Sequence, residues 1–183
     1  MPPSSSSRPQ NHSSIWGALL LGIFLIWMST FGPCADETKE LIGQKAPPLR
    51  GVFVTDGVSN SPEQWFELES LRGKTVVVDF WASWCPPCRA SVPVLEAFAR
   101  AHPEVQVLGV NVEGDRDPLF VAQAHRSLGA TYPTIHDTNG QLLSAYRVRN
   151  LPTIFVIDPD GKVKDTHVGV VSRAWLEEKA GKK

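Results

Sequence analysis

Three short apolar runs stand out along the chain, at residues 75–81 (TVVVDFW), 105–112 (VQVLGVNV) and 153–157 (TIFVI). Runs of this length and composition are typical of strands buried on both faces of a sheet. The letters DPDG at 158–161 predict a tight turn. We therefore expect residues 162–168 to return as the hairpin partner of the third strand.

Helical segments are expected between and after these strands. They cover residues 86–101, 117–128, 141–146 and 172–180, with Asp117 and Ser172 as N-caps and Pro118 at a first helical position. A short strand is expected at 52–54, and a strand or a helical turn at 65–71. The order β-α-β-α-β-β-α predicts an α/β fold with helices on both faces of one sheet.

The N-terminus has a different pattern. Residues 1–14 are polar and rich in Ser and Pro, which predicts a disordered tail. Residues 15–31 are apolar without a charge, and as a helix they would reach ~26 Å. This length fits a signal-anchor or a signal peptide better than a buried core helix. We assign 32–41 to a linker and 42–183 to one globular domain.

Three fates of the hydrophobic segment remain open: an uncleaved anchor, a lipoprotein attached through Cys34, and a secreted form. Pro33 directly before Cys34 is a poor fit to a lipoprotein signal. All three fates place the globular domain outside the cytoplasm. Arg8 favours an N-terminus on the inside, since positive charge tends to stay cytoplasmic.

Composition and cysteine count narrow the function classes. A net charge of −1 argues against nucleic-acid binding, which needs a basic face. The five histidines are scattered, and a single C-x-x-C at Cys85 and Cys88 cannot close a four-ligand zinc site. We therefore predict no metal and no cofactor.

The C-x-x-C pair lies where the strand at 75–81 meets the helix at 86–101. A sulfur at a helix N-terminus is stabilised as the reactive thiolate by free N–H groups and the helix dipole. Pro86 and Pro87 fit the first turn, where a missing N–H costs little. Cys88 lies one helical turn beyond Cys85 and can reach its sulfur. The spacing favours a redox-active pair over a static disulfide or half of a metal site.

Residues 78–89, VDFWASWCPPCR, closely resemble the active-site segment of thioredoxins. Pro93 falls where thioredoxins have a helix-kinking proline, and LPT at 151–153 resembles their cis-proline loop. The stretch 112–137, together with IGQKAP at 42–47 and LRGK at 71–74, is similar to TlpA/ResA-like membrane-anchored thioredoxins. The resemblance implies a thioredoxin fold with an N-terminal extension and a central insertion.

The resemblance also implies roles for individual residues. Cys85 would be the exposed nucleophile and Cys88 the buried resolving thiol. Pro152 would follow Leu151 through a cis peptide bond and place its backbone beside the sulfurs. The substrate would contact Trp84, Pro86, Pro87 and Leu151.

Asp79 is the one acid within the apolar run of the first central strand. Burial would raise its pKa toward neutrality, as suits a proton shuttle. It matches the buried acid of thioredoxins that helps to deprotonate the resolving cysteine, whereas many TlpA/ResA-like relatives have Asn there. Some relatives also carry an acid three residues after the second cysteine. Ser91 occupies that position here, so that role is not transferred.

The leading functional hypothesis is reduction of disulfides in exported proteins, for example apocytochrome c, with electrons from a membrane donor protein. The domain would face the periplasm of a bacterial-type inner membrane. A net oxidase or isomerase is the first alternative. A copper-delivery module is the second, although such proteins use a C-x-x-x-C pair. A peroxiredoxin-like peroxidase is excluded, because Ala82 and Val78 replace its required Thr or Ser and its Pro.

Overall fold

The computed structural model describes residues 36–54 and 65–181. The predicted tail, the hydrophobic segment and Cys34 lie outside these residues. Within the described ranges, no helix has both the length and the apolar character needed to cross a bilayer.

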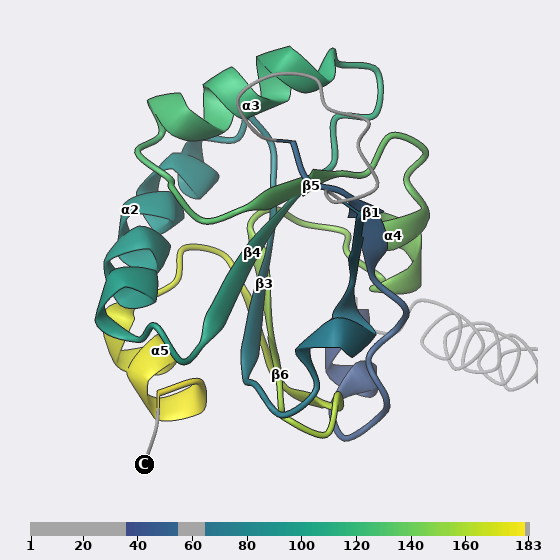
Figure 1. Cartoon of the computed structure of the whole chain (residues 1–183), viewed down its shortest axis with the longest axis vertical. Helices are drawn as coiled ribbons and strands as arrows, with labels where there is room; N and C mark the ends of the chain where they lie inside the picture. The colour runs from purple at the N-terminus through teal and green to yellow at the C-terminus, as the bar shows by residue number, and fades with distance from the viewer. Residues whose placement is uncertain (1–35, 55–64, 182–183) are drawn as a thin grey trace, which may run out of the picture. The chain divides into compact units, whose positions relative to one another are not determined.

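A five-stranded mixed sheet forms the centre of the domain (Figure 1). Its order is β5-β4-β3-β6-β7; β3, β4 and β5 run parallel, while β6 and β7 pair antiparallel with their neighbours. The strands are β3 (Val76–Trp81), β4 (Gln106–Asn111), β5 (Thr134–His136), β6 (Thr153–Ile157) and β7 (Val163–Val168). The predicted α/β class is confirmed.

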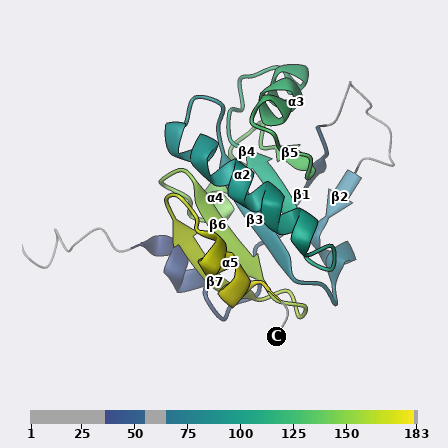
Figure 2. The same cartoon turned by 90° about the vertical axis from the view of Figure 1, so that its left-hand side faces the viewer.

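Helices cover both faces of the sheet, as expected. α2 (Pro86–Ala101) and α5 (Arg173–Lys179) lie on one face, in front of the sheet in Figure 2. α4 (Gln141–Ala145) and a small hairpin of β1 (Arg50–Val52) and β2 (Trp65–Glu67) lie on the other face (Figure 1). The remaining helices are η1 (Glu37–Leu41), η3 (Leu68–Leu71) and α3 (Pro118–Ser127).

β3 is the central strand and all six of its residues are buried. Successive side chains of a strand point to opposite faces. Val78 and Phe80 accordingly join the core on the β1 and α4 side, whereas Val77 packs with residues of α2 and α5. Asp79 follows the same alternation, so its carboxyl group points to the α2 side of the sheet.

The segment before β2 pairs with both outer strands of the sheet. Gly43 N donates to Val163 O (2.8 Å), and Val163 N donates to Gln44 O (2.9 Å), at the beginning of β7. At the opposite edge, Val54 N donates to Thr134 O of β5 (2.8 Å). The predicted N-terminal extension is therefore part of the packed sheet edges.

Most predicted elements are confirmed within a few residues. Asp117 and Ser172 cap α3 and α5 by accepting from backbone N–H groups, and residues 65–71 form both a strand and a helical turn. The first strand begins earlier than expected, at Arg50. β5 was not predicted. Residues 37–41, assigned to the linker, form η1, in which Thr38 is buried and hydrogen-bonds to Thr166 of β7 (3.2 Å).

Candidate active site

The junction between β3 and α2 places the two cysteines as the sequence predicts. Cys85 is the N-cap of α2, and its Sγ accepts a hydrogen bond from Cys88 N (3.2 Å). Pro86 and Pro87 occupy the first two helical positions and have no N–H. The Cys88 N–H is therefore the first donor the helix offers, and it is directed at the Cys85 sulfur. This contact and the helix dipole favour negative charge on Cys85.

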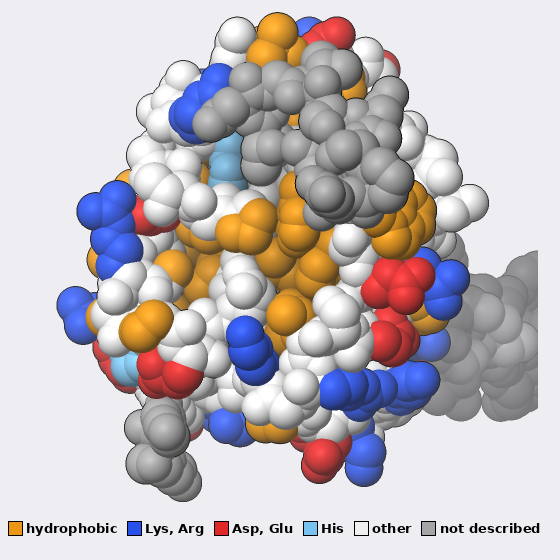
Figure 3. Space-filling view, viewed as in Figure 1, with side chains coloured by type: hydrophobic (Ala, Val, Ile, Leu, Met, Phe, Trp, Pro, Cys, Tyr) orange, Lys and Arg blue, Asp and Glu red, His pale blue; other side chains and the backbone are white. Residues whose placement is uncertain are grey.

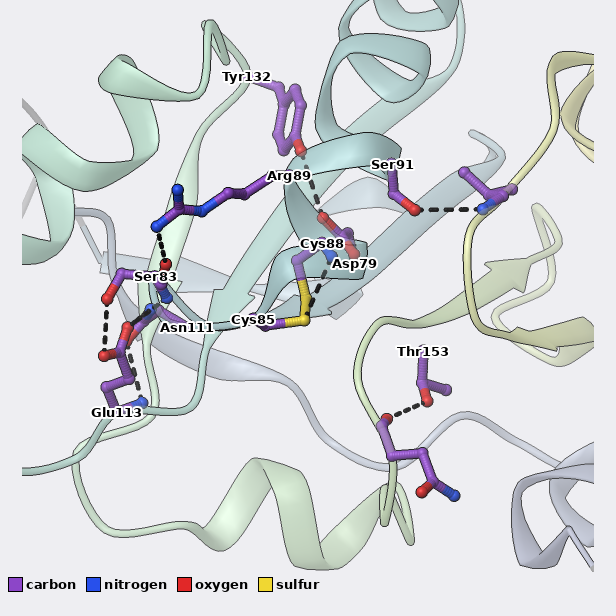
Figure 4. Close-up of a disulfide and its surroundings, with 12 residues drawn as sticks. Asp79, Ser83, Cys85, Cys88, Arg89, Ser91, Asn111, Glu113, Tyr132 and Thr153 are labelled. Carbon is purple, nitrogen blue, oxygen red and sulfur yellow. Dashed lines mark hydrogen bonds between the residues drawn. A yellow bond between two sulfur atoms is a disulfide. The ribbon is translucent and has the colours of Figure 1, made fainter.

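Cys85 and Cys88 are joined by a disulfide (Figure 4). Both residues are buried, Cys85 at 2% exposure and Cys88 at 0%. Exposure of Cys85 was therefore wrongly predicted for this oxidised state. The physical reason is a cluster of apolar residues around the pair, which includes Trp81 and Val121, with Leu151 packed against it. A reaction partner has to approach Cys85 between these side chains.

Asp79 lies on the α2 side of β3 and is completely buried. Burial raises the pKa of Asp79 to about 7, and a hydrogen bond from Tyr132 opposes part of that rise. Tyr132 Oη donates to Asp79 Oδ2 (3.3 Å), as Figure 4 shows. Oδ1 is buried with no hydrogen-bond partner among the described residues. A carboxyl group that titrates near neutrality exchanges protons easily at physiological pH.

The Leu151–Pro152 peptide bond is cis, as expected. β6 begins at the next residue, Thr153, which pairs with Phe80 of β3. Because Phe80 lies five residues before Cys85, this register brings the Pro152 loop to the same end of the sheet as the disulfide. Leu151 is half-buried against the cysteine cluster.

The Pro152 loop is tied to a second loop that precedes α5. Gly169 N donates to Pro152 O (2.9 Å), and Val171 N donates to the buried Oγ of Ser91 on α2 (3.1 Å). Ser91 is thus a neutral acceptor that holds this loop. The Ser91 hydroxyl group holds the backbone at Val171 and places no charge near Cys88.

The residues expected to meet a substrate differ in exposure. Trp84 is 63% exposed, and Pro86 and Pro87 are also exposed, whereas Leu151 is half-buried. Trp84, Pro86 and Pro87 are neighbours of the two cysteines in the sequence and are accessible to a protein partner. On the face seen in Figure 3, hydrophobic side chains likewise gather near the centre, and charged side chains lie mainly toward the periphery.

Glu113 is a site residue that the sequence reasoning missed. Its buried carboxylate accepts hydrogen bonds from Ser83 N (2.6 Å) and Ser83 Oγ (2.9 Å), two residues before Cys85. Asn111 Nδ2 donates to the same carboxylate (3.0 Å). Asn111 ends β4 and Glu113 follows it, at the carboxyl end of a parallel strand where functional groups gather. That position was the signal available in the sequence.

Tyr132 and His125 were also missed. Tyr132 precedes β5, and His125 comes from α3; both are buried close to the acid at Asp79. Neither residue has a neighbouring motif that marks it. No group of three or more His, Cys, Asp or Glu side chains arranged to hold a metal ion occurs within residues 36–54 and 65–181.

Comparisons with known proteins agree with this geometry. The sequence matches the Redoxin family over residues 41–182. It is 30% identical to thiol-disulfide oxidoreductase ResA of Oceanobacillus iheyensis, over 87% of this chain and 82% of that protein. It is 26% identical to sporulation thiol-disulfide oxidoreductase A of Bacillus subtilis, over 87% and 94%.

A solved thiol:disulfide interchange protein of the thioredoxin family from Chlorobium tepidum has a similar fold. The TM-score is 0.62 at 29% identity, covering 74% of this chain and 92% of that chain. The fold of the present chain, its cysteine pair at the start of α2 and its cis-proline loop agree with these comparisons. The chain belongs to the Redoxin family and is a TlpA/ResA-like thiol–disulfide oxidoreductase of the thioredoxin superfamily.

Proposed function

We propose that this enzyme reduces disulfides in exported proteins, with Cys85 as the attacking sulfur and Cys88 as the resolving thiol. The observation that carries the proposal is Asp79, which is completely buried on the same side of β3 as Cys88. Burial raises the pKa of this carboxyl group to about 7. A base of this kind has no use in a static disulfide. It has a use where a buried thiol must lose a proton.

The reaction begins with the dithiol form. The Cys85 thiolate attacks one sulfur of the client disulfide, and the other client sulfur leaves as a thiolate and takes up a proton. Asp79 accepts the proton of Cys88, whose thiolate attacks Cys85 Sγ. The second client sulfur leaves as a thiolate and takes up a proton, and Asp79 returns its own proton to solvent. The client gains two electrons, and the enzyme is left with the Cys85–Cys88 disulfide seen in the structure.

The cycle closes when a donor dithiol reduces that disulfide. We place the donor in a bacterial-type inner membrane and the domain on its periplasmic side, tethered by residues 15–31. The apolar run and its position before the domain support this placement. An apocytochrome c is one client class that fits, because its cysteines must be reduced before haem is attached.

A net oxidase is the second candidate, and the hydrogen bond from Cys88 N to Cys85 Sγ favours it. Stabilising the thiolate stabilises the reduced enzyme and makes the pair more oxidising. The reduction potential separates the two directions. A value near about −270 mV supports the reductase, and one near about −120 mV supports the oxidase.

Trapping in cells tests the exchange itself. In a Cys34→Ser background, Cys88→Ser should stall on Cys85 as a mixed disulfide with the client, because the resolving step is removed. Cys85→Ser is the matched control and should trap little. Equal trapping by both variants would contradict the assignment of the nucleophile, and absence of trapping together with absence of disulfide reduction would contradict the function.

A further inference from the structure

The buried acid at Asp79 has one hydrogen-bond donor in the part of the chain that the structure describes. Tyr132 Oη donates to Oδ2 (3.3 Å), while Oδ1 has no partner there. The two residues are 53 positions apart, Asp79 in β3 and Tyr132 in the loop before β5, so the contact depends on the packing of the insertion against β3. Whatever stabilises the ionised form of Asp79 by hydrogen bonding therefore comes from this one phenol.

Aromatic packing holds the phenol in place. The Tyr132 ring meets the His125 ring edge-on, with centroids 4.8 Å apart, and His125 stacks on Trp81 at 4.9 Å. Trp81 belongs to β3, two residues after Asp79, and its Nε1 donates to Thr134 Oγ1 of β5 (3.1 Å). The stack connects β3, α3 and β5, so Tyr132 cannot rotate away from the carboxyl group without disturbing it.

The titratable groups around Tyr132 keep its hydroxyl protonated, so that it remains a hydrogen-bond donor to Asp79. Burial, followed by the charge of Asp79, raises the pKa of Tyr132 well above its usual range, so the hydroxyl keeps its proton. Burial lowers the pKa of His125 to about 4, so this ring is neutral near pH 7. The carboxylate of Glu96 on α2 also faces this region, where it forms an ion pair with Arg100 (2.6 Å) and accepts two hydrogen bonds from Thr131.

We propose that Tyr132 is a positioning residue that stabilises the Asp79 carboxylate and thereby sets the pH range in which the buried acid takes the proton of Cys88. The proposal rests on the proposed function of Asp79. A donor to a carboxylate favours its charged form. Without the hydroxyl, Asp79 stays protonated to higher pH and the resolving step loses its base at neutral pH.

The test uses both tyrosines of the chain. Tyr132→Phe removes the hydroxyl and keeps the ring. Tyr146→Phe is the matched control, because Tyr146 is also buried but donates to Pro47 O (2.9 Å) on the opposite face of the sheet. The measurement is the rate of reduction of a model peptide disulfide by the dithiol enzyme from about pH 5 to about pH 9.

We expect the inflection due to Asp79 to rise by about one pH unit in Tyr132→Phe, the scale of one hydrogen bond to a charged group. The rate should fall by up to about tenfold below the wild-type inflection and recover at high pH. Tyr146→Phe should leave the profile unchanged. Carbon-13 NMR titration of the Asp79 carboxyl group should show the same shift, which a loss of packing alone would not produce.

A second variant should shift the inflection due to Asp79 in the opposite direction, to lower pH. Fluorotyrosine incorporated in the Tyr146→Phe background labels only position 132, and its more acidic hydroxyl is a stronger donor, so the inflection should move to lower pH. An unchanged inflection in Tyr132→Phe and in the fluorotyrosine protein would overturn the proposal. If Asp79→Asn keeps the wild-type inflection, the proton-acceptor role of Asp79 in the proposed function fails instead.

Discussion

Replacing Asp79 with asparagine should stabilise the oxidised protein at neutral and alkaline pH. The folded-state pKa of Asp79 is raised from 3.8 to about 7 because the group is buried. A group with a raised pKa contributes its full stability below the unfolded-state value, and this contribution is lost as pH rises toward the folded-state value. The window of the loss is therefore about pH 4 to about pH 7, where the unfolded chain ionises Asp79 and the folded chain does not.

The size of the effect follows from the same two values. A shift of about three pKa units corresponds to ~4 kcal/mol at ~1.36 kcal/mol per unit. Asparagine has nearly the same shape and does not titrate. The difference in unfolding free energy between Asp79→Asn and the wild type should thus grow by up to about 4 kcal/mol, in favour of the variant, between pH 4 and pH 8.

Urea unfolding with linear extrapolation at several pH values measures this difference. Other carboxyl groups titrate in both proteins and cancel. Asp137→Asn is a control of opposite sign, because Asp137 is also buried but accepts hydrogen bonds from Leu142 N (3.1 Å) and Leu143 N (2.8 Å). It should lose about 1–3 kcal/mol at neutral pH. A constant difference between Asp79→Asn and the wild type across the range would refute the reasoning.

Two further substitutions test the packing around the site. Glu113→Gln should lower the unfolding free energy by about 1–3 kcal/mol and speed amide hydrogen exchange at Ser83. The reason is that the two Ser83 hydrogen bonds go to different carboxylate oxygens, and the amide nitrogen of glutamine cannot accept one. Unchanged exchange at Ser83 would show that Glu113 does not hold this backbone. Gly109→Ala should lower the unfolding free energy measured in urea by about 1–3 kcal/mol. A Cβ at this position would lie 2.7 Å from Thr134 Oγ1 and disturb the hydrogen bond of that oxygen with Trp81. Unchanged stability would show that β5 can shift away from β4 at little energetic cost.

The sequence was informative where local pattern and tertiary environment agree. β3 is predicted because its apolar run reflects burial on both faces, and the β6–β7 hairpin because Gly161 adopts the left-handed conformation its turn requires (φ 73°). β5 was missed because it has only three residues and a single large apolar side chain, Ile135. Its strand character comes from backbone pairing with β4, which no local pattern records.

The same distinction applies to the site. Cys85, Cys88 and Asp79 could be predicted because they lie within ten residues of one another along a recognisable strand and helix. Tyr132 could not, because its partner is 53 residues away and the contact depends on the register of the insertion. The burial of Cys85 was missed for a similar reason, since the covering side chains come from distant parts of the chain.

The pairing of the N-terminal extension with the outer strands has a consequence for client selection. Outer strands with free N–H and C=O groups act as templates on which an extended foreign chain adds as another strand. Clients of a disulfide-exchange enzyme expose extended segments. Because residues 42–54 occupy backbone groups of β7 and β5, such segments find fewer sites for unproductive β-augmentation. Under the proposed function, this leaves the cis-proline loop, at the same end of the sheet as the disulfide, as the place where a client backbone would pair.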